Sequence, residues 1–418
     1  MIQAVIMAAG KSTRTWPLTL TMPKPLLKVM NKEIIKHNLD ALQGLVSEVI
    51  VIVGYRQEMI VNEIGHKYGK LKIRYVEQKR QLGTGHALKN VEQLIKDKFV
   101  VIGGDDIFSK KDIRACLKHK YAVLGCEVED PCRFGVFVLK GKEVKKIVEK
   151  PKKFVSDIAN TGLYVFDKSV FSFKLKKSQR GEYEIVDYIN MLVKKEKIIC
   201  EKVKGYWLSV GHPWDLIEAN SVLVSEIKSD IKGKVEKNVV VKGKLKIGKG
   251  TEILSGTYIK GNVVIGDNCH IGPNSFLRGN TSIGNGCHIG QAVEIKNSII
   301  MDNAKVPHLS YIGDSVIGKD SNLGAGTITA NLKHDNKNVR SAVKGKLVDT
   351  GRRKLGAIIA DNVHTGINTT IYPGRKIWPG LGTLPGEVVD KERHLELSRH
   401  AWRTLPDNFL ILAIFQKF

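Results

Sequence analysis

An aliphatic residue recurs at every sixth position through the C-terminal half of the chain, and this period restricts the fold more than any other feature. Nine consecutive positions fit it: Ile247, Ile253, Ile259, Ile265, Ile271, Leu277, Ile283, Ile289 and Ile295. A six-residue period matches neither the helical period of about 3.6 residues nor the two-residue alternation of a half-buried strand. It is typical of a hexapeptide β-solenoid, in which three hexapeptides of about 18 residues in all form one triangular coil.

Small or β-branched residues stand four positions after the first eight of these aliphatic residues. They are Thr251, Thr257, Val263, Cys269, Ser275, Thr281, Cys287 and Val293. We expect the aliphatic side chains to fill the axis of a prism and the small ones to fit its narrow corners. Cys269 and Cys287 should then stack as core thiols in successive coils. The register slips by one residue and resumes at Ile300, slips again before Ile317, and continues in a last set from Ile359.

The residues before about 210 follow a different pattern, in which apolar β-branched runs alternate with amphipathic stretches. This pattern predicts an α/β, Rossmann-like domain with a mostly parallel sheet covered on both faces. Ligands of such sheets bind beyond the carboxyl ends of the strands. We therefore expect a domain over 1–225, a connecting helix within 213–232 and the solenoid over 233–390. The polar stretch from Asn331 to about Lys354 should leave the solenoid as a loop. The tail 391–418 fits either a docking helix or a cloning or reading-frame scar.

Composition narrows the classes of partner. The net charge of +25 suits phosphorylated ligands or nucleic acid. The basic residues are spread along the chain, without an RNP-type aromatic motif or a zinc-binding spacing, so we expect no nucleic-acid partner. No apolar run reaches the length of a membrane span and no signal peptide opens the chain, so we expect a cytoplasmic protein without a membrane partner. Six cysteines without a CxxC pair fit free thiols in a reducing compartment.

A glycine-containing segment follows the first predicted strand, at residues 8–27. Its small residues let backbone amides approach a polyphosphate, and Lys11, Arg14 and Lys24 add positive charge. It is not a Walker A loop. The segment resembles the signature of sugar-phosphate nucleotidylyltransferases. That resemblance implies nucleotide binding by Ala8, Ala9, Gly10 and Lys11, and catalytic roles for Arg14 and Lys24.

Further motifs follow in the order of that family. The segment QLGTGHA at 81–87 resembles the base-reading segment of N-acetylglucosamine-1-phosphate uridylyltransferases. The resemblance implies that Gln78, Gly83 and Thr84 bind the base of UTP (or dTTP) and that Asp105 binds Mg²⁺. It also implies a set of sugar-contacting residues, which are Gly135, Glu149, Lys150 and Asn160. The implied reaction is attack of a sugar-1-phosphate oxygen on the nucleotide α-phosphate with release of pyrophosphate, helped by charge neutralisation.

One position departs from the family's pattern. Relatives often carry a second metal-binding aspartate in a W-x-D-x-G string, whereas this chain has Ser209 there, within 207–211. Asp215 lies six residues further on and cannot be assumed to replace it. The sequence therefore offers Asp105 as a metal-binding aspartate and no second one at position 209.

The segment 307–331 resembles the acetyltransferase site of bifunctional N-acetylglucosamine-1-phosphate uridylyltransferase/glucosamine-1-phosphate acetyltransferases, in the archaeal branch of that family. The resemblance implies that His308 is the general base, since the amine must lose a proton before it attacks acetyl-CoA. It implies a sugar-phosphate site made of Arg278, Lys296, Tyr311, Asn322 and Asn331. Ala325 would lie near acetyl-CoA, and Lys337, with Lys333 and Arg340, either meets the phosphates of coenzyme A or belongs to an ordinary solvated loop. The same resemblance implies a left-handed β-helix and a homotrimer.

Two other functions remain open at this stage. One is a dTDP-glucose, ADP-glucose or GDP-mannose type pyrophosphorylase with a regulatory, non-catalytic solenoid. The other is a scaffold subunit like those of translation exchange factors, which share the two-part layout. The base-reading segment and the string around His308 argue against the first, and Arg14, Lys24 and Asp105 argue against the second. The sequence does not distinguish glucosamine from galactosamine or glucose substrates.

Overall fold

Apolar, β-branched runs in the N-terminal half pair into one ten-stranded sheet of the computed structural model, which describes residues 2–178 and 180–393. The sheet order is β10-β11-β13-β9-β12-β7-β1-β4-β6-β5. Its strands are β1 (Gln3–Met7), β4 (Glu48–Val53), β5 (Lys67–Tyr68), β6 (Leu71–Glu77), β7 (Phe99–Gly103), β9 (Ala122–Glu127), β10 (Gly135–Lys140), β11 (Glu143–Glu149), β12 (Ile158–Phe166) and β13 (Ile199–Lys202).

The prediction of a mostly parallel sheet is correct for four neighbouring strands and for the pair β9–β13, whereas the other pairs are antiparallel. Strands β7, β1, β4 and β6 are parallel neighbours, as the alternation of strands and helices predicted. On the other side, β12 runs antiparallel to both β7 and β9, and β10 and β11 form a hairpin. A hairpin needs only a short turn, here at Gly141 with φ 60°, whereas a parallel neighbour needs a long crossover.

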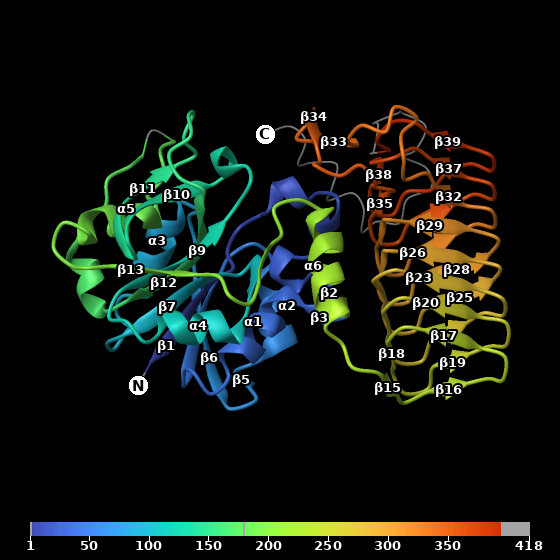
Figure 1. Cartoon of the computed structure of the whole chain (residues 1–418), viewed down its shortest axis with the longest axis horizontal. Helices are drawn as coiled ribbons and strands as arrows, with labels where there is room; N and C mark the ends of the chain where they lie inside the picture. Colours follow the sequence, from blue (N-terminus) through green and yellow to red (C-terminus); the bar gives the residue numbers. More distant parts are fainter. Residues whose placement is uncertain (1, 179, 394–418) are drawn as a thin grey trace.

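Helices cover both faces of this sheet, as expected (Figure 1). They are α1 (Ile34–Leu42), α2 (Gln57–Ile64), α3 (Thr84–Lys89), α4 (Lys110–Cys116) and α5 (Ile185–Leu192). Alternate residues of β1 point to opposite faces. Val5 therefore packs in the core that contains α3 and α5, whereas Ala4 and Ile6 pack in the core that contains α1, α2 and α4.

Short elements complete this half. Two small sheets pair β2 (Lys28–Val29) with β3 (Lys32–Glu33), and β8 (Asp106–Phe108) with β14 (Trp207–Ser209). The 3₁₀ turns are η1 (Thr13–Thr15), η2 (Leu18–Leu20), η3 (Lys24–Leu26), η4 (Pro131–Arg133) and η5 (Lys168–Ser172). The predicted connecting helix forms as α6 (Asp215–Ser225).

The hexapeptide half folds into three parallel sheets that share one apolar axis. Column 1 holds β15 (Asp230–Ile231), β18 (Leu245–Ile247), β21 (Val263–Ile265), β24 (Thr281–Ile283), β27 (Ile299–Ile300), β30 (Val316–Ile317), β35 (Ile358–Ile359) and β38 (Lys376–Ile377). Column 2 holds β16 (Lys234–Val235), β19 (Glu252–Ile253), β22 (His270–Ile271), β25 (His288–Gln291), β28 (Lys305–His308), β31 (Asn322–Leu323) and β36 (His364–Thr365). Column 3 holds β17 (Val240–Lys242), β20 (Tyr258–Lys260), β23 (Phe276–Arg278), β26 (Glu294–Lys296), β29 (Tyr311–Gly313), β32 (Ile328–Thr329), β37 (Thr370–Ile371) and β39 (Val388–Val389).

The period read from the sequence sets the pairing between coils. Ile265 pairs with Ile283, 18 residues on, and Ile283 pairs with Ile300, only 17 on, where the sequence register slips. The aliphatic residues of the period are buried on the axis, and Cys269 and Cys287 are buried free thiols in that core, as predicted. The predicted polar excursion leaves the prism as a hairpin of β33 (Arg340–Val343) and β34 (Lys346–Asp349).

The two halves pack along column 1, on the face that carries α6 (Figure 1). Outward-facing Val316 and Ile358 of this column are buried in one cluster with Trp214 and Leu223 near or in α6. Because hydrophobic burial scales with apolar area, a shared core of this kind holds the halves together.

The segment after the first strand also contacts the prism. The Trp16 ring meets the Trp378 ring edge to face, with centroids 5.9 Å apart. Lys376 Nζ donates to the Trp16 carbonyl at 3.2 Å, and the Thr21 hydroxyl donates to Asp361 Oδ2 at 2.6 Å. The candidate phosphate-binding segment is therefore seated between the sheet and the prism.

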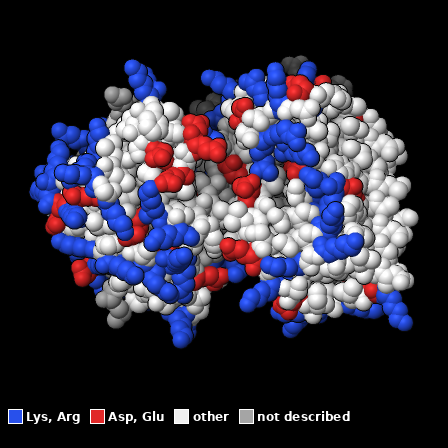
Figure 2. Space-filling model, in the orientation of Figure 1, with Lys and Arg blue, Asp and Glu red and all other residues white. Residues whose placement is uncertain are grey.

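Lys and Arg side chains are spread over the visible face of the N-terminal half, whereas on the prism they lie mainly toward that half and the outer part of the prism is largely free of them in this view (Figure 2). None of the helices among residues 2–178 and 180–393 has the length and apolarity needed to cross a membrane. Most of the predicted tail, residues 394–418, lies outside the described residues.

Burial decides how much each axial residue of the prism contributes to stability. Ile283 is fully buried. Ile231, in the same column and at the same place in the repeat, is 49% exposed in the first coil, at the N-terminal end of the prism, which we call the open end. We expect Ile283→Ala to lower the free energy of unfolding by about 2–5 kcal/mol. Ile231→Ala, the matched control, should cost less than about 1 kcal/mol. Denaturant unfolding followed by circular dichroism measures both; equal losses would contradict the assignment of Ile283 to the axial core.

Candidate active sites

A cavity of about 230 Å³ opens where β1 and β7 end, at the carboxyl edge of the parallel strands. Seven of the predicted nucleotide and metal residues line it, which are Ala8, Ala9, Gly10, Gln78, Gly83, Thr84 and Asp105. Gly104 sits so close to β1 that an added Cβ would lie 2.8 Å from the Met7 carbonyl oxygen. Only glycine allows the strand ends to approach in this way.

Lys24 and Asp105 form the charged centre of this cavity. The Pro-Lys-Pro segment turns Lys24 inward at η3, and its Nζ lies 2.8 Å from Asp105 Oδ2. The lysine side chain is 4% exposed, whereas the aspartate side chain is 46% exposed toward the cavity. Burial opposes ionisation of Asp105, but the charge and hydrogen bond of Lys24 outweigh it and lower the pKa of Asp105.

A second carboxylate stands beside the first. A Cβ added at Gly103 would lie 3.0 Å from Asp105 Oδ1 and 3.6 Å from Asp106 Oδ2, so both side chains converge over this glycine. Ser209, at the position where relatives often have a metal-binding aspartate, pairs across the β8–β14 ladder with Asp106. Burial and the charge of Asp105 raise the pKa of Asp106 to about 7. Asp106 was missed from the sequence, although the doubled aspartate in GGDD was its signal.

The predicted base-binding residues Gln78, Gly83 and Thr84 lie together, and the local backbone packing requires glycine at position 83. Gln78 Nε2 donates to the Gly83 carbonyl at 3.1 Å, and Thr84 Oγ1 accepts from the backbone N–H of Ile185 at 3.0 Å. At Gly83, φ is 106° and an added Cβ would lie 2.3 Å from the Tyr183 carbonyl oxygen. Close backbone packing against Tyr183 therefore requires glycine at this position, which also lines the cavity.

The remaining predicted residues of this half occupy two places. Lys11 and Arg14 are exposed on the segment after β1, outside the cavity lining. Gly135 and Glu149 are partners across the β10–β11 hairpin, and a Cβ on Gly135 would lie 2.8 Å from Glu149 Oε2 and 3.8 Å from Asn160 Cβ. Gly135, Glu149 and Asn160 thus converge as predicted, with Lys150 in the left-handed region at the end of β11, where φ is 40°.

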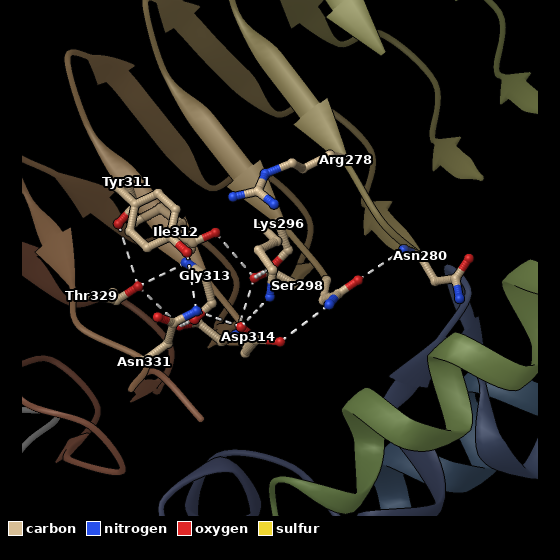
Figure 3. A network of polar contacts seen from close by, with 12 residues as sticks. Arg278, Asn280, Lys296, Ser298, Tyr311, Ile312, Gly313, Asp314, Thr329 and Asn331 are labelled. Carbon is tan, nitrogen blue, oxygen red and sulfur yellow. Dashed lines mark hydrogen bonds and ion pairs between the residues drawn. The ribbon is translucent and has the colours of Figure 1, made fainter. Parts of the chain in front are cut away.

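In the prism, four of the predicted sugar-phosphate residues gather where column 3 turns toward column 1 (Figure 3). They are Arg278, Lys296, Tyr311 and Asn331. Asn331 Nδ2 donates to the Tyr311 hydroxyl at 3.0 Å. Arg278 Nε donates to Glu294 Oε1 at 2.6 Å. Burial and the charge of Asp314 raise the pKa of Tyr311, so its hydroxyl keeps its proton at neutral pH.

Asp314 is a residue of this cluster that the sequence did not single out. It is buried, with 3% exposed, and its carboxylate forms an ion pair of 2.6 Å with Lys296 Nζ. Asn331 Nδ2 donates to the same oxygen. Its signal was its place in the string YIGD, three residues after the predicted Tyr311.

His308 and Ala325 lie at the other edge of column 3, at the turns that lead from the strands of column 2 into those of column 3. His308 ends β28 and is exposed, and its carbonyl accepts from the Gly326 N–H at 3.2 Å. Ala325 thus lies in the coil next to that of His308. Asn322 lies in column 2 and pairs with Lys305 and His364, away from the other sugar-phosphate residues.

A second cavity, of about 570 Å³, lies beside the β33–β34 hairpin. Lys333 and Arg340 line it, together with Arg375, which the sequence did not single out. Lys337 is exposed and, like Ala325, is not part of the lining. Three cationic side chains make this cavity suitable for anionic groups.

Known proteins resemble both halves of the chain. A family model described as nucleotidyl transferase matches residues 3–226, and one described as the GMPPB C-terminal domain matches 259–379. Bifunctional protein GlmU of Methanocaldococcus jannaschii is 44% identical, over 92% of this chain and 94% of its own length. A bifunctional sugar-1-phosphate nucleotidylyltransferase/acetyltransferase of Sulfurisphaera tokodaii is 40% identical, over 94% and 98%.

A solved structure from Bacillus anthracis, named as a glucose-1-phosphate thymidylyltransferase, resembles the N-terminal half. It is 31% identical, covers 55% of this chain and 98% of its own, and gives a TM-score of 0.51. Both relatives that match nearly the whole length are named as bifunctional, and the name of the second states the two activities. The cavity at Asp105 and the cluster at Asp314 occupy separate halves of this chain. The chain therefore belongs to the family of bifunctional sugar-1-phosphate nucleotidylyltransferases and acetyltransferases.

Proposed function

We propose that this chain acetylates glucosamine-1-phosphate with acetyl-CoA and then joins the product to the UMP of UTP, with release of pyrophosphate. The observation that carries the proposal is the polar cluster around Asp314, which brings Lys296 and Asn331, two of the predicted sugar-phosphate residues, to one buried carboxylate. It supports the bifunctional enzyme over a pyrophosphorylase with a non-catalytic solenoid. Galactosamine-1-phosphate and dTTP are the alternative substrates to compare.

In the N-terminal half, residues 1–225 would form the nucleotidyl-transfer domain. Backbone amides of Ala8 to Gly10 would receive the phosphates at the end of β1, with Lys24 and Arg14 neutralising their charge. The sugar-1-phosphate would lie toward Asn160, so that its phosphate oxygen attacks the α-phosphorus in line. Pyrophosphate then leaves toward the basic segment after β1.

Mg²⁺ fits the donor set at the centre of this cavity. Asp105 and Asp106 offer two converging carboxylates, and Mg²⁺ in such sites typically takes one or two carboxylates plus substrate phosphates. The described residues hold no group of three or more metal-ligating side chains, which fits a site completed by the nucleotide. When bound, the ion neutralises charge on the phosphates. Asp106 would supply the carboxylate that Ser209 lacks.

In the prism, residues 233–390 would form the acetyl-transfer domain, with the hand of a left-handed β-helix. His308 would take the proton of the sugar amine as its nitrogen attacks the thioester carbon. The new N–C bond would replace the C–S bond, and coenzyme A would leave as its thiol after taking up a proton. Lys296, Arg278, Tyr311 and Asn331 would hold the sugar phosphate. Ala325 would lie against acetyl-CoA, and the cations of the second cavity would meet its phosphates.

A homotrimer would complete this site. Three large apolar side chains stand exposed near the turn from column 2 to column 3, and they are Leu309 (64%), Ile367 (54%) and Leu384 (70%). This ridge flanks His308 and Ala325, whereas a convex prism provides no deep cleft for them. Packing against a second copy would bury the ridge and add a wall, and closed symmetry would end the association.

The first test follows both reactions in one mixture. Incubation with glucosamine-1-phosphate, acetyl-CoA, UTP and Mg²⁺ should give UDP-N-acetylglucosamine, identified by mass. His308→Ala should slow acetyl transfer by about 10²–10⁴-fold, because the general base is lost. Nucleotidyl transfer to N-acetylglucosamine-1-phosphate should persist, because its site lies in the other half. Undiminished acetylation by His308→Ala would remove this residue from the mechanism.

The second test moves a carboxylate across the β8–β14 ladder. Asp105→Asn should abolish nucleotidyl transfer, and Asp106→Asn should weaken Mn²⁺ binding in the presence of UTP by about 10-fold or more. The double variant Asp106→Asn/Ser209→Asp should recover much of that affinity, because the two positions are cross-strand partners. Electron paramagnetic resonance of Mn²⁺ measures binding independently of turnover. Wild-type affinity in Asp106→Asn would show that Asp106 does not bind the metal.

The third test concerns the trimer. The full chain should scatter light as a trimer, and Ile367→Asp should dissociate it, because a charge would be buried in the ridge. Acetyl transfer should fall with dissociation while nucleotidyl transfer remains. Val240→Asp, at an exposed site near the open end of the prism, is the matched control and should stay trimeric. A wild-type monomer with full acetyltransferase activity would contradict a site shared between copies.

A further inference from the structure

Three hydrogen-bond donors converge on the Asp314 carboxylate (Figure 3). Lys296 Nζ lies 2.6 Å from Oδ2, and Asn331 Nδ2 donates to the same oxygen. Asn297 Nδ2 donates to Oδ1 at 3.2 Å. Because the carboxylate is 3% exposed, its partners are these side chains rather than bulk water. One buried anion therefore sets the positions of two residues predicted to bind the sugar phosphate.

This arrangement also fixes which atoms remain for a ligand. The Asn331 amide nitrogen uses its two hydrogens on Asp314 and on the Tyr311 hydroxyl. Its carbonyl oxygen is then oriented as an acceptor, and the Tyr311 hydroxyl, which accepts from Asn331, keeps its own hydrogen to donate. Lys296 likewise spends one of its three ammonium hydrogens on Asp314. A sugar phosphate offers the complementary hydroxyl donors and phosphate acceptors.

A ladder of asparagine side chains from the preceding coils holds Asp314. Asp314 and Asn297 occupy the same turn in successive coils, 17 residues apart, and both are in the left-handed region, at φ 49° and 45°. Asn297 Oδ1 accepts from the Asn280 N–H at 3.1 Å. Asn280 Nδ2 in turn donates to Ser221 Oγ of α6 at 2.8 Å. The ladder that ends at Asp314 thus begins at the helix that joins the two halves.

We propose that Asp314 is a positioning residue of the acetyl-transfer site, which presets Lys296 and Asn331 to receive an amino-sugar phosphate. This rests on the proposed function of the prism. Asp314 does not itself move a proton or bind the reacting atoms. It acts through the ammonium and the amide that its carboxylate holds, and through Asn331 on Tyr311.

A simpler explanation is that such a ladder only stabilises a turn. The chain contains a second Asn–Asp pair on another turn, which serves as a control for that explanation. At another turn of the prism, Asn303 Nδ2 donates to Asp320 Oδ1 at 3.0 Å. These residues are also 17 apart and left-handed, at φ 59° and 57°. No ion pair of Asp320 with a cation is found in the part of the chain that the structure describes. It therefore shares the turn chemistry of Asp314 without the candidate site.

The test compares Asp314→Asn with Asp320→Asn in the full chain. An amide keeps the shape but has one acceptor oxygen where three donors converge, so a donor must lose its partner. We expect Asp314→Asn to raise KM for glucosamine-1-phosphate, and its Kd by calorimetry, by about 10–100-fold. The melting temperature should fall, because the buried Lys296 ammonium loses its anion, whereas the KM for acetyl-CoA and the rate of nucleotidyl transfer should change little. Asp320→Asn should leave all of these near wild type.

A second pair of variants reports on the same role with less risk to folding. Asn297→Gly deletes the anchor of Asp314 Oδ1 without backbone strain, because glycine accepts positive φ. It should raise KM for glucosamine-1-phosphate by several-fold, while Asn303→Gly, its control, should not. In Lys296→Met the further change Asp314→Asn should add little to KM, since the main partner is already gone.

The outcomes separate this role from the proposed function. Unchanged Kd for glucosamine-1-phosphate in both Asp314→Asn and Asn297→Gly would overturn the positioning role while leaving the function intact. Equal losses in the Asp314 and Asp320 variants, in step with melting temperature, would reduce the ladder to a structural turn. The reaction would be refuted, and the positioning role kept, if the wild-type chain transferred no acetyl group but bound glucosamine-1-phosphate with an affinity that Asp314→Asn lowers. A wild-type chain that does not bind this ligand would overturn both.

Discussion

The stacking of one aliphatic side chain on the next along the prism axis is the interaction on which the rest of this structure depends. Neighbouring parallel strands lie about 4.8 Å apart, so a repeat that returns the same residue type to the same place buries a continuous apolar row. The inner rows of the three columns meet in one cluster, of which Ile283 and Ile295 are fully buried members. With the interior fixed in this way, each turn of the coil can carry polar residues outward, and the candidate site lies on such turns.

The seam between the halves adds a second constraint, because it gives the prism a fixed relation to the sheet. Its buried residues come from α6, from the segment after β1 and from column 1. Each half alone would therefore expose apolar side chains that the other half covers. The same face places Asn280 against α6. Two candidate sites that carry out separate chemistry are thus built on elements that touch a common helix.

Much of this could be predicted from the sequence, because the relevant signals are local. The hexad period indicates the prism, its slips indicate where the coil shortens from 18 to 17 residues, and motif order brings Gln78, Gly83 and Asp105 to one cavity. The antiparallel half of the sheet was not predicted, since near-continuous apolar strands look alike in either direction. The roles of Asp106 and Asp314 depend on cross-strand register and on turns in successive coils, and neither is visible in a single stretch of sequence.

The edge-to-face contact between Trp16 and Trp378 has a consequence for how such a chain can lengthen or shorten. Trp16 belongs to the segment that follows the first strand, and Trp378 to the last coils of the prism. A whole coil inserted between Ile317 and Ile359 would shift Trp378 along the axis by about 4.8 Å, away from its partner. A coil added at the open end, before Leu245, would leave this contact untouched. The Trp16–Trp378 contact therefore constrains the number of coils at one end of the prism and not at the other.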